Sequence, residues 1–319
     1  MSVLKLPKKI HRFSQYALSS LLWLTLIVGC RTSTTPPSDR LRDDLNRPVS
    51  VTPPVSRIIT LAPSLTELTF SAGAGSLLVA VTTADDFPPA VDSLPRFSAL
   101  PLNIEQIVAF QPQLVLATTQ INRLDEAEQL ERLGIPVYFF TFQSIKDIPR
   151  VIRQIGWLAG TDSTATKAAQ QFEVQLKELQ TKVAHLHHPR VLLLIGDQTL
   201  YAFGGNSYVH EAIQIAGGES ITAHFDQPAI ILTEEFILKA QPDVIIGLWG
   251  SAYASETFLA FHPSLRQTPA AQNRRIFSLP AAWLARPGPR ILLGIKQMAR
   301  IIHPEAFSPA LQDSLVSSK

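Results

Sequence analysis

Apolar residues between Asp162 and His187 recur at steps of three and four positions, a spacing that places them on one face of a helix. They are Ala165, Ala168, Ala169, Phe172, Leu176, Leu179, Val183 and Leu186. Neither Gly nor Pro interrupts the segment, and Pro189 follows shortly after it. The pattern predicts one helix over residues 162–187, about 37 Å long at the usual rise per residue. By itself the stripe fits either a surface helix of a single domain or a rod between two domains.

Short apolar runs rich in β-branched residues alternate with helix-like segments on both sides of this helix, and each run predicts a buried strand. The expected strands are 57–62, 77–82, 114–117 and 137–141 before the helix, and 190–195, 200–203, 244–246 and 276–279 after it. Alternating strands and helices with short connections are typical of mostly parallel sheets covered by helices on both faces. The expected fold is therefore α/β, with two Rossmann-like lobes joined by one long rigid helix.

An internal sequence repeat supports two related lobes rather than one domain. The segment 103–115 resembles the segment 233–244, and each copy opens with a helix-capping residue, runs two helical turns and stops at Gln-Pro before a strand. Glu105 in the first copy corresponds to Glu235 in the second. Chance recurrence of a helix–strand unit is the alternative, and internal duplication accounts better for the matched order.

These patterns divide the chain into segments. We expect an N-terminal lobe over 57–142, connecting helices over 143–188, a C-terminal lobe over 189–303 and a loosely held tail over 304–319. In the first of these, Ser64 and Glu67 have the spacing of a helix capping box.

The N-terminus has the pattern of an export signal. Basic residues precede an apolar run from Tyr16 to Val28 that is too short for a comfortable membrane span, and the run ends at Cys30. The ending Ile27-Val28-Gly29-Cys30 resembles a bacterial lipobox, so residues 1–30 are expected to be a lipoprotein signal peptide with lipid attached to Cys30. A signal anchor with an incidental cysteine is the alternative. The Pro-, Ser- and Thr-rich stretch 31–56 is expected to be a disordered tether.

Composition narrows the function further. The chain of 319 residues carries 28 basic and 26 acidic residues, a balance that gives no reason to expect a nucleic-acid surface. Cys30 is the single cysteine, which excludes an internal disulfide and a cysteine-rich metal site. The length suggests two domains.

Several segments together resemble one known family. They are 57–68, Asp86-Phe87-Pro88-Pro89, 103–115, Gly204-Gly205-Asn206-Ser207 and 283–290. In this order and spacing, from about residue 57 to 303, the chain resembles the helical-backbone substrate-binding proteins of ABC importers, which take up vitamin B12, haem and ferric siderophores. The resemblance implies two α/β lobes, a rigid connecting helix and a ligand held in the cleft between the lobes. It also implies an ABC permease with its ATPase subunits as partner, a location at the cell envelope, and a monomer without a resident cofactor.

Glu105 and Glu235 have two interpretations. Each falls in the first turn of its predicted helix, where a carboxylate favours the positive end of the helix dipole by about 0.3–1 kcal/mol without any partner. In the family that the chain resembles, the matching glutamates of the two lobes dock onto arginines of the permease. Charge pairing at two separated points fixes orientation and speeds encounter, and the internal repeat places one glutamate on each lobe. We therefore expect a docking role.

Candidate pocket residues are Trp283 and Arg286, which match a family segment that lines the cleft, and Phe87 in an earlier family motif. Trp249 and Tyr201 stand at expected strand ends, where open α/β sheets bind ligands. Ordinary packing is the alternative for each aromatic residue. The vitamin B12 binder of the family has aromatic residues at positions that match Ala84, Leu100 and Thr118 in this chain, a departure that leaves the ligand open among corrinoid, haem and ferric siderophore.

The remaining motifs give little support for a catalytic or metal site. His185, His187 and His188 are expected to form a polar helix end rather than a metal site, and Asp85-Asp86 before two prolines favours a turn over a pair of catalytic carboxylates. No nucleophile elbow, phosphate loop or metalloprotease signature occurs. We expect a binding protein rather than an enzyme. A lipoprotein enzyme that uses the interlobe cleft and a ligand sensor without transport remain the alternatives.

Overall fold

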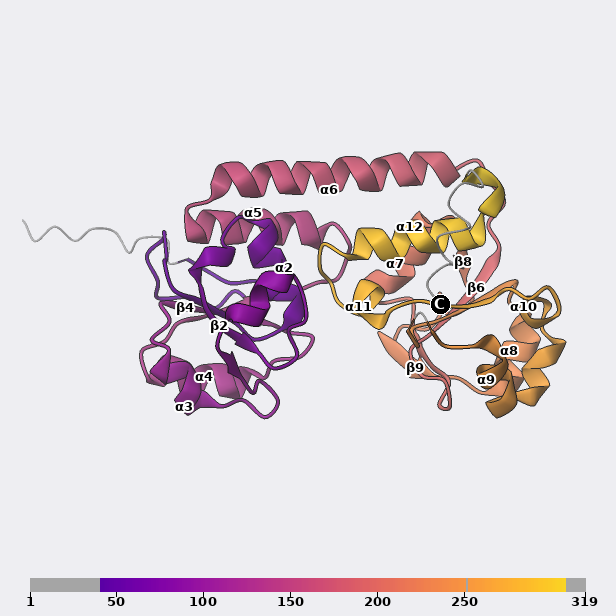
Figure 1. The fold of residues 1–319 in the computed structure, drawn as a ribbon, viewed down its shortest axis with the longest axis horizontal. Coiled ribbons are helices and arrows are strands. Elements are labelled where there is room, and N and C mark those ends of the chain that lie inside the picture. The colour runs from indigo at the N-terminus through magenta and orange to yellow at the C-terminus, as the bar shows by residue number, and fades with distance from the viewer. Residues whose placement is uncertain (1–40, 251, 308–319) are drawn as a thin grey trace, which may run out of the picture. The chain divides into compact units, whose positions relative to one another are not determined.

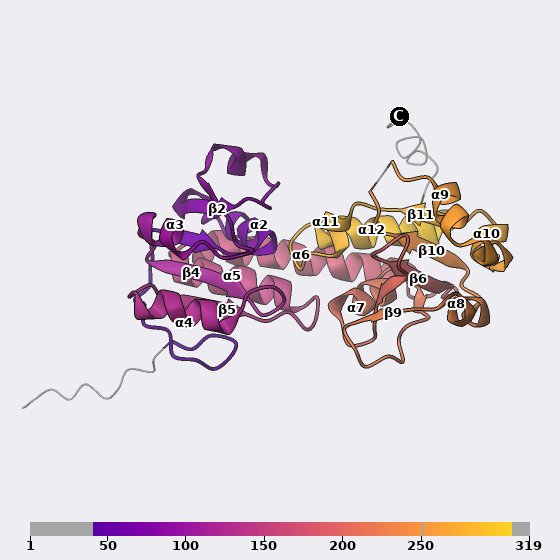
Figure 2. The same ribbon diagram turned by 90° about the horizontal axis from the view of Figure 1, so that it is seen from below.

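The N-terminal lobe is built on one parallel sheet. The computed structural model describes residues 41–250 and 252–307. In this lobe the strands are β1 (Ile58–Thr60), β2 (Leu78–Thr82), β3 (Arg96–Phe97), β4 (Leu114–Thr118) and β5 (Val137–Phe140). They form a five-stranded sheet of order β3-β2-β1-β4-β5 in which every pairing is parallel, and the labelled strands β2, β4 and β5 follow that order in Figure 2.

The C-terminal lobe repeats this plan with an antiparallel edge. Its strands are β6 (Arg190–Leu194), β7 (Tyr201–Phe203), β8 (Glu219–Ser220), β9 (Ala229–Ile231), β10 (Val244–Gly247) and β11 (Ile276–Ser278). The sheet runs β11-β10-β6-β7-β9, and β8 pairs in parallel with β6. Strands β6, β10 and β11 are parallel, whereas β7 is antiparallel to both neighbours. The predicted α/β fold with mostly parallel sheets is confirmed.

Helices cover both faces of each sheet. They are α2 (Pro63–Ser71), α3 (Ile104–Ala109), α4 (Leu124–Arg132), α5 (Asp147–Ala159), α6 (Asp162–Val183), α7 (Tyr208–Ile215), α8 (Glu234–Ala240), α9 (Ser255–Phe261), α10 (Pro269–Gln272), α11 (Ala281–Leu284) and α12 (Ile291–Ile302). Short 3-10 helices lie at Gly75–Leu77, Pro89–Ser93, Pro263–Gln267 and Pro304–Ala306. Successive strand residues point to opposite faces, so Ile58 packs toward α2 and α5 while Ile59 packs toward α3 and α4.

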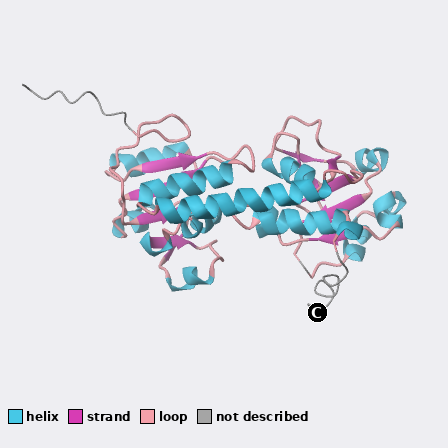
Figure 3. Cartoon of the chain, turned by 90° about the horizontal axis from the view of Figure 1, so that it is seen from above, coloured by secondary structure: helices cyan, strands magenta, loops and turns pink. Residues whose placement is uncertain are grey.

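One hydrophobic core runs through both lobes along α6. Phe172, Leu176 and Leu179 of α6 are buried in the same cluster as residues of α5 in the first lobe and of α7 and α12 in the second. Figures 1 and 3 show α6 passing over both lobes, with α5 beneath one part and α12 beneath another. Each such side chain contributes about 1.5–3 kcal/mol when fully buried. Bending α6 would expose this core, which explains why a single helix can hold the two lobes as a unit.

The long helix is shorter than expected. It ends at Val183, and Ala184 forms the C-cap, whereas the sequence pattern extends to residue 187. Among residues 184–188, Leu186 alone packs against the core, and only partly. The residue before a proline is pushed out of helical geometry, so Pro189 favours an extended His188 and an early stop. His185, His187 and His188 are exposed there.

A single glycine sets the distance between α5 and α6. A Cβ atom added at Gly156 of α5 would lie 2.2 Å from the Cβ of Ala165 on α6. The two helices therefore approach one another through a glycine facing an alanine, and any larger residue at either position would push them apart.

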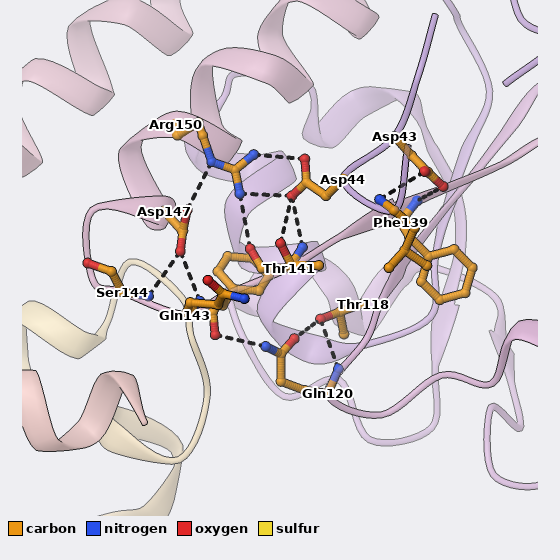
Figure 4. Close-up of polar contacts among 12 residues, drawn as sticks. Asp43, Asp44, Thr118, Gln120, Phe139, Thr141, Gln143, Ser144, Asp147 and Arg150 are labelled. Atoms are coloured by element: carbon orange, nitrogen blue, oxygen red, sulfur yellow. Dashed lines mark hydrogen bonds and ion pairs between the residues drawn. The ribbon is translucent and has the colours of Figure 1, made fainter. Parts of the chain in front are cut away.

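The expectation of a disordered tether is wrong for residues 41–56. Residues 41–56 are ordered on the N-terminal lobe, with Val49 and Val55 buried in the core. Figure 4 shows how the segment is fixed: the Asp44 carboxylate accepts hydrogen bonds from the Thr141 backbone and from both terminal nitrogens of Arg150. Asp43 is buried and ion-paired with Arg47 at 2.8 Å. Composition did not indicate this order, because the contacts that fix the segment are polar and specific, and a low apolar content does not exclude them.

The described chain ends in a short 3-10 helix at Pro304–Ala306 followed by Phe307. The Phe307 ring lies 4.3 Å from the Lys182 ammonium group. The expected signal peptide with Cys30, the first part of the tether (31–40) and the rest of the tail (308–319) lie outside the described residues. Within the part of the chain that is described, no helix is both long and apolar enough to cross a membrane.

Candidate ligand-binding site

A cleft of about 650 Å³ is lined by both lobes. Its lining consists of Leu61, Pro63, Ser64, Thr82, Thr83, Ala84, Ala99, Leu100, Thr118, Gln120, Ile121 and Phe142 from the N-terminal lobe, and Phe203, Asn206, Ser207, Tyr208, Pro228, Ala229, Ala285, Arg286 and Pro287 from the C-terminal lobe. Thr82 and Thr118 are the last residues of the parallel strands β2 and β4. In the N-terminal lobe the cleft therefore lies at the carboxyl ends of the sheet, the position where open α/β sheets bind ligands, and its volume is typical of small-molecule sites.

Two glycines shape the C-terminal wall of this cleft. A Cβ atom at Gly204 would lie 2.0 Å from the Gln227 carbonyl oxygen, and one at Gly205 would lie 2.0 Å from the Ala223 carbonyl oxygen. Because both positions lack a side chain, the loop that carries Pro228 can pack against the start of α7. The motif Gly204-Gly205-Asn206-Ser207 thus brings two stretches of the wall together, and Ser207 caps α7 by accepting from the His210 backbone N–H.

A cluster of four charged residues joins the lobes at one edge of the cleft. Arg290 makes a two-pronged contact with Glu67 on α2, with nitrogen–oxygen distances of 2.6 and 3.0 Å. Arg286 Nη1 lies 2.6 Å from Asp86 Oδ1, and Arg290 reaches the same oxygen at 3.3 Å. Arg290 also stacks over the Phe87 ring at 4.5 Å. Two-pronged arginine–carboxylate pairs are directional and strong, so this cluster fixes the lobes against each other.

The environment keeps this cluster charged. Burial raises the pKa of the Glu67 carboxyl, although Arg290 and Arg286 act in the opposite direction. Burial acts upward on Asp86 too, but hydrogen bonding to Arg286 and the charges of both arginines outweigh it and lower the pKa of Asp86. For Arg290, burial would lower the pKa, yet Glu67 and Asp86 outweigh it and raise the pKa. The two-pronged geometry and the raised pKa of Arg290 indicate that Arg290 and Glu67 form an ion pair at neutral pH. The two arginines and the two carboxylates of the cluster then have no net charge.

A second interlobe contact involves Glu211 on α7. Its Oε2 atom accepts hydrogen bonds from the Ser144 hydroxyl and the Ile145 backbone N–H, each at 2.7 Å. Ser144 follows β5 of the N-terminal lobe, close to the turn where the Gln120 side chain donates to the Phe142 carbonyl oxygen at 3.0 Å (Figure 4). The lobes are therefore held by polar contacts at two places besides the common core.

Only one of the five predicted pocket residues lines the cleft. Arg286 does. Trp283 packs against the common core, and Trp249 stacks on Phe258 with ring centroids 4.8 Å apart. Tyr201 and Phe87 are each 39% exposed but are absent from the lining that the structure describes. Ordinary packing, the alternative interpretation, therefore holds for both tryptophans. A position at a strand end or in a motif does not determine the direction in which a side chain points.

Ala84, Leu100 and Thr118 all line the cleft. The vitamin B12 binder of the family has aromatic residues at the matching positions. The difference between this chain and that binder therefore lies in the cleft lining. Leu100 is 67% exposed and Ile121 is 44% exposed. At these two exposed positions the cleft therefore presents aliphatic rather than aromatic surface.

Glu105 and Glu235 lie at equivalent positions of the two lobes. Each is exposed and is the second residue of its helix, α3 or α8, with Asn103 or Thr233 as the capping residue. Both helices cover the sheet face opposite the common core, as Ile107 and Ile237 show by their burial in the other two clusters. Neither glutamate lines the cleft within the described chain.

Sequence reasoning missed the partners Glu67, Arg290 and Glu211. Glu67 was expected in a capping box, yet α2 begins at Pro63 after Ala62 without a side-chain cap, and the Glu67 carboxylate points to Arg290. The turn itself is formed by Thr83 and Ala84. Asp85 closes it and accepts from Thr82, whereas Asp86 lies after the turn and faces the arginines. In the described residues no group of His, Cys, Asp and Glu is arranged to hold a metal ion.

Comparison with known proteins agrees with this architecture. The model of the periplasmic binding protein family matches residues 58–282. A vitamin B12-binding protein of Vibrio parahaemolyticus is 30% identical over 243 residues, which cover 76% of this chain and 87% of that relative. The solved periplasmic vitamin B12 binding protein of Vibrio cholerae has a TM-score of 0.70 and 28% identity, covering 79% of this chain and 98% of that one. The solved periplasmic haem-binding protein of Roseiflexus sp. RS-1 in its apo form has a TM-score of 0.70 and 25% identity, covering 79% and 100%.

These relatives are named as binding proteins, which confirms the expectation of a binding protein rather than an enzyme. The match extends over both lobes and α6. By its sequence and by its fold, the chain belongs to the periplasmic binding protein family.

Proposed function

We propose that this protein binds a corrinoid in the cleft between its lobes and delivers it to an ABC importer. The observation that carries the proposal is the cleft itself, which is lined by both lobes, is mostly apolar and has a volume of about 650 Å³. A relative that matches 76% of the chain at 30% identity is named a vitamin B12-binding protein. A large ligand with an apolar ring edge and neutral polar substituents suits aliphatic walls with scattered hydroxyl and amide groups.

The lining supports a corrinoid over haem. A protein that holds haem iron uses an axial ligand such as His, Met, Cys or Tyr. Among the lining residues of the described chain, Tyr208 alone belongs to these types. Burial raises the pKa of its hydroxyl, which disfavours the phenolate that iron requires. The protein therefore suits a chelate that arrives with its metal already fully coordinated.

Absorbance spectroscopy tests this choice. The full chain, purified in detergent, is titrated separately with cyanocobalamin, haemin and a ferric hydroxamate chelate. We expect saturable changes in the corrin bands at one equivalent of cyanocobalamin and no change in the Soret band beyond that of haemin with detergent alone. A saturable Soret shift without a response to cyanocobalamin would contradict the corrinoid proposal and favour haem.

Membrane attachment forms a further part of the proposal. Cys30 ends a short apolar run and is followed by a Pro-, Ser- and Thr-rich stretch, and a cysteine carrying two or more acyl chains anchors a protein stably. The protein would then work as a lipid-anchored monomer on the periplasmic face of a bacterial membrane. Cys30→Ser is expected to move the protein from the membrane fraction to the soluble fraction or to leave it unprocessed. A mature N-terminus elsewhere, without lipid, would exclude the lipid anchor.

Delivery requires contact with the permease, for which we propose Glu105 and Glu235. They are exposed, equivalent in the two lobes and outside the cleft lining. Two separated acidic points fit a partner that presents cationic side chains to both lobes at once. Their role can be tested independently of ligand binding.

A further inference from the structure

Arg286 is the one charged residue among those that line the cleft in the described part of the chain. A partly buried guanidinium in an otherwise uncharged cleft would by itself attract an anionic ligand group. Its side chain is 26% exposed, so it is accessible from the cleft and partly removed from water. Whether the cleft favours anions therefore depends on whether the Arg286 guanidinium already has an anionic partner.

Asp86 occupies it. The carboxylate lies 2.6 Å from Arg286 Nη1 and 3.3 Å from Arg290 Nη2, and it does not itself line the cleft. Glu67 balances Arg290 through its two-pronged contact. The four residues together carry no net charge, and the lowered pKa of Asp86 keeps its carboxyl ionised at neutral pH.

We infer that Asp86 is a specificity-determining residue that neutralises Arg286 from outside the cleft, so that the cleft selects uncharged ligands over the same ligands bearing an anionic group. An anion at Arg286 must either displace Asp86 or lie beside it, and like charges brought together across a binding site are strongly disfavoured. Displacement carries a second cost, because the Asp86–Arg286 contact joins the two lobes. The inference takes the cleft of the proposed function as the binding site but does not depend on the ligand class.

Two fluorescent dyes form a matched pair for the test. N-phenyl-1-naphthylamine is neutral, and 1-anilinonaphthalene-8-sulfonate is the same ring system with one sulfonate; both become fluorescent in apolar surroundings. The full chain in detergent below its micelle concentration, or with a detergent blank subtracted, is titrated with each dye. For the wild type we expect the neutral dye to bind about tenfold more tightly than the sulfonate, or better.

Three variants separate neutralisation from other effects. Asp86→Asn is expected to raise the sulfonate affinity about tenfold while the neutral dye changes by less than about twofold. Adding Arg286→Gln to it should remove that gain, because the uncovered cation is then gone. Asp92→Asn is the matched control: it removes the same charge from the same segment, but Asp92 is 77% exposed and pairs with Arg96 outside the cluster.

The location of the dye is checked with Ala84→Trp, which fills the cleft from an exposed lining position and should abolish binding of the neutral dye. An unchanged sulfonate affinity in Asp86→Asn would overturn the inference, as would a gain that persists in the double variant. Neutral-dye binding that survives Ala84→Trp would overturn it too, since an accessible apolar cleft is required. Neither dye is a metal chelate, so a failure here leaves the corrinoid proposal standing, and a failure of the corrinoid titration leaves this result standing.

Discussion

Gln111 and Gln241 adopt the same left-handed backbone conformation, with φ of 49° and 46°, at matching points of the two lobes. Each directly precedes a proline and ends the turn after its short helix. Beyond them the Gln113 backbone N–H donates to the Arg57 carbonyl oxygen, and the Asp243 N–H donates to that of Arg190. Left-handed geometry is uncommon for residues other than glycine. Its recurrence at Gln111 and Gln241 shows that the internal sequence repeat is also a structural repeat.

The repeat gives the docking proposal its sharpest test. Replacing both Glu105 and Glu235 with Ala should leave ligand affinity nearly unchanged and abolish delivery, measured as uptake or as ATPase stimulation in a reconstituted importer. Replacing both with Arg should be worse, because like charges would meet the partner's cations at a cost of several kcal/mol. A helix-end role alone predicts a loss of about 0.3–1 kcal/mol per site in stability with delivery intact. Full uptake by the double Ala variant at limiting protein would show that these residues do not dock.

The contact between α5 and α6 predicts an unusual response to a helix-favouring substitution. In an exposed helix Gly→Ala gains about 1 kcal/mol. At Gly156 the new Cβ would lie 2.2 Å from that of Ala165, so Gly156→Ala should instead destabilise the protein by about 1–3 kcal/mol. Chemical denaturation measures the difference, and Gln175→Ala on the exposed face of α6 serves as the control. A stabilised Gly156→Ala variant would mean that the two helices can separate freely.

Much of the fold follows from local patterns, whereas the site depends on contacts between distant residues. The stripe on α6 and the apolar strands are visible because burial repeats with the period of each element. Ser255–Phe261, which forms α9, was not expected, because it begins after Ala254 without the side-chain cap that marked the equally short α8. Glu67 and Arg290 lie far apart in the chain, and neither position alone indicates the other. Arg286 was found because it belongs to a motif, while Trp283 in the same motif turns to the core.

Acid should weaken the interlobe cluster through Asp86. The folded-state pKa of Asp86 lies below its ordinary value of 3.8, so the stability from this group is fully present above that pH and is lost as pH falls through the lowered folded pKa. The difference in melting temperature between the wild type and Asp86→Asn should therefore stay constant from pH 7 to 5 and vanish only below about pH 3.8. A difference that already disappears between pH 7 and 5 would show that Asp86 is not held ionised by the arginines.

We propose that one corrinoid is held by both lobes at once. Isothermal titration with cyanocobalamin tests it on the wild type and on two variants with a charge at an exposed lining position, Leu100→Asp in the N-terminal lobe and Pro228→Asp in the C-terminal lobe. Leu293→Asp, at a position 49% exposed and outside the cleft, is the control. We expect a stoichiometry of one, a loss of about tenfold or more in affinity for each lining variant and no loss for the control. Undiminished binding by either lining variant would contradict it.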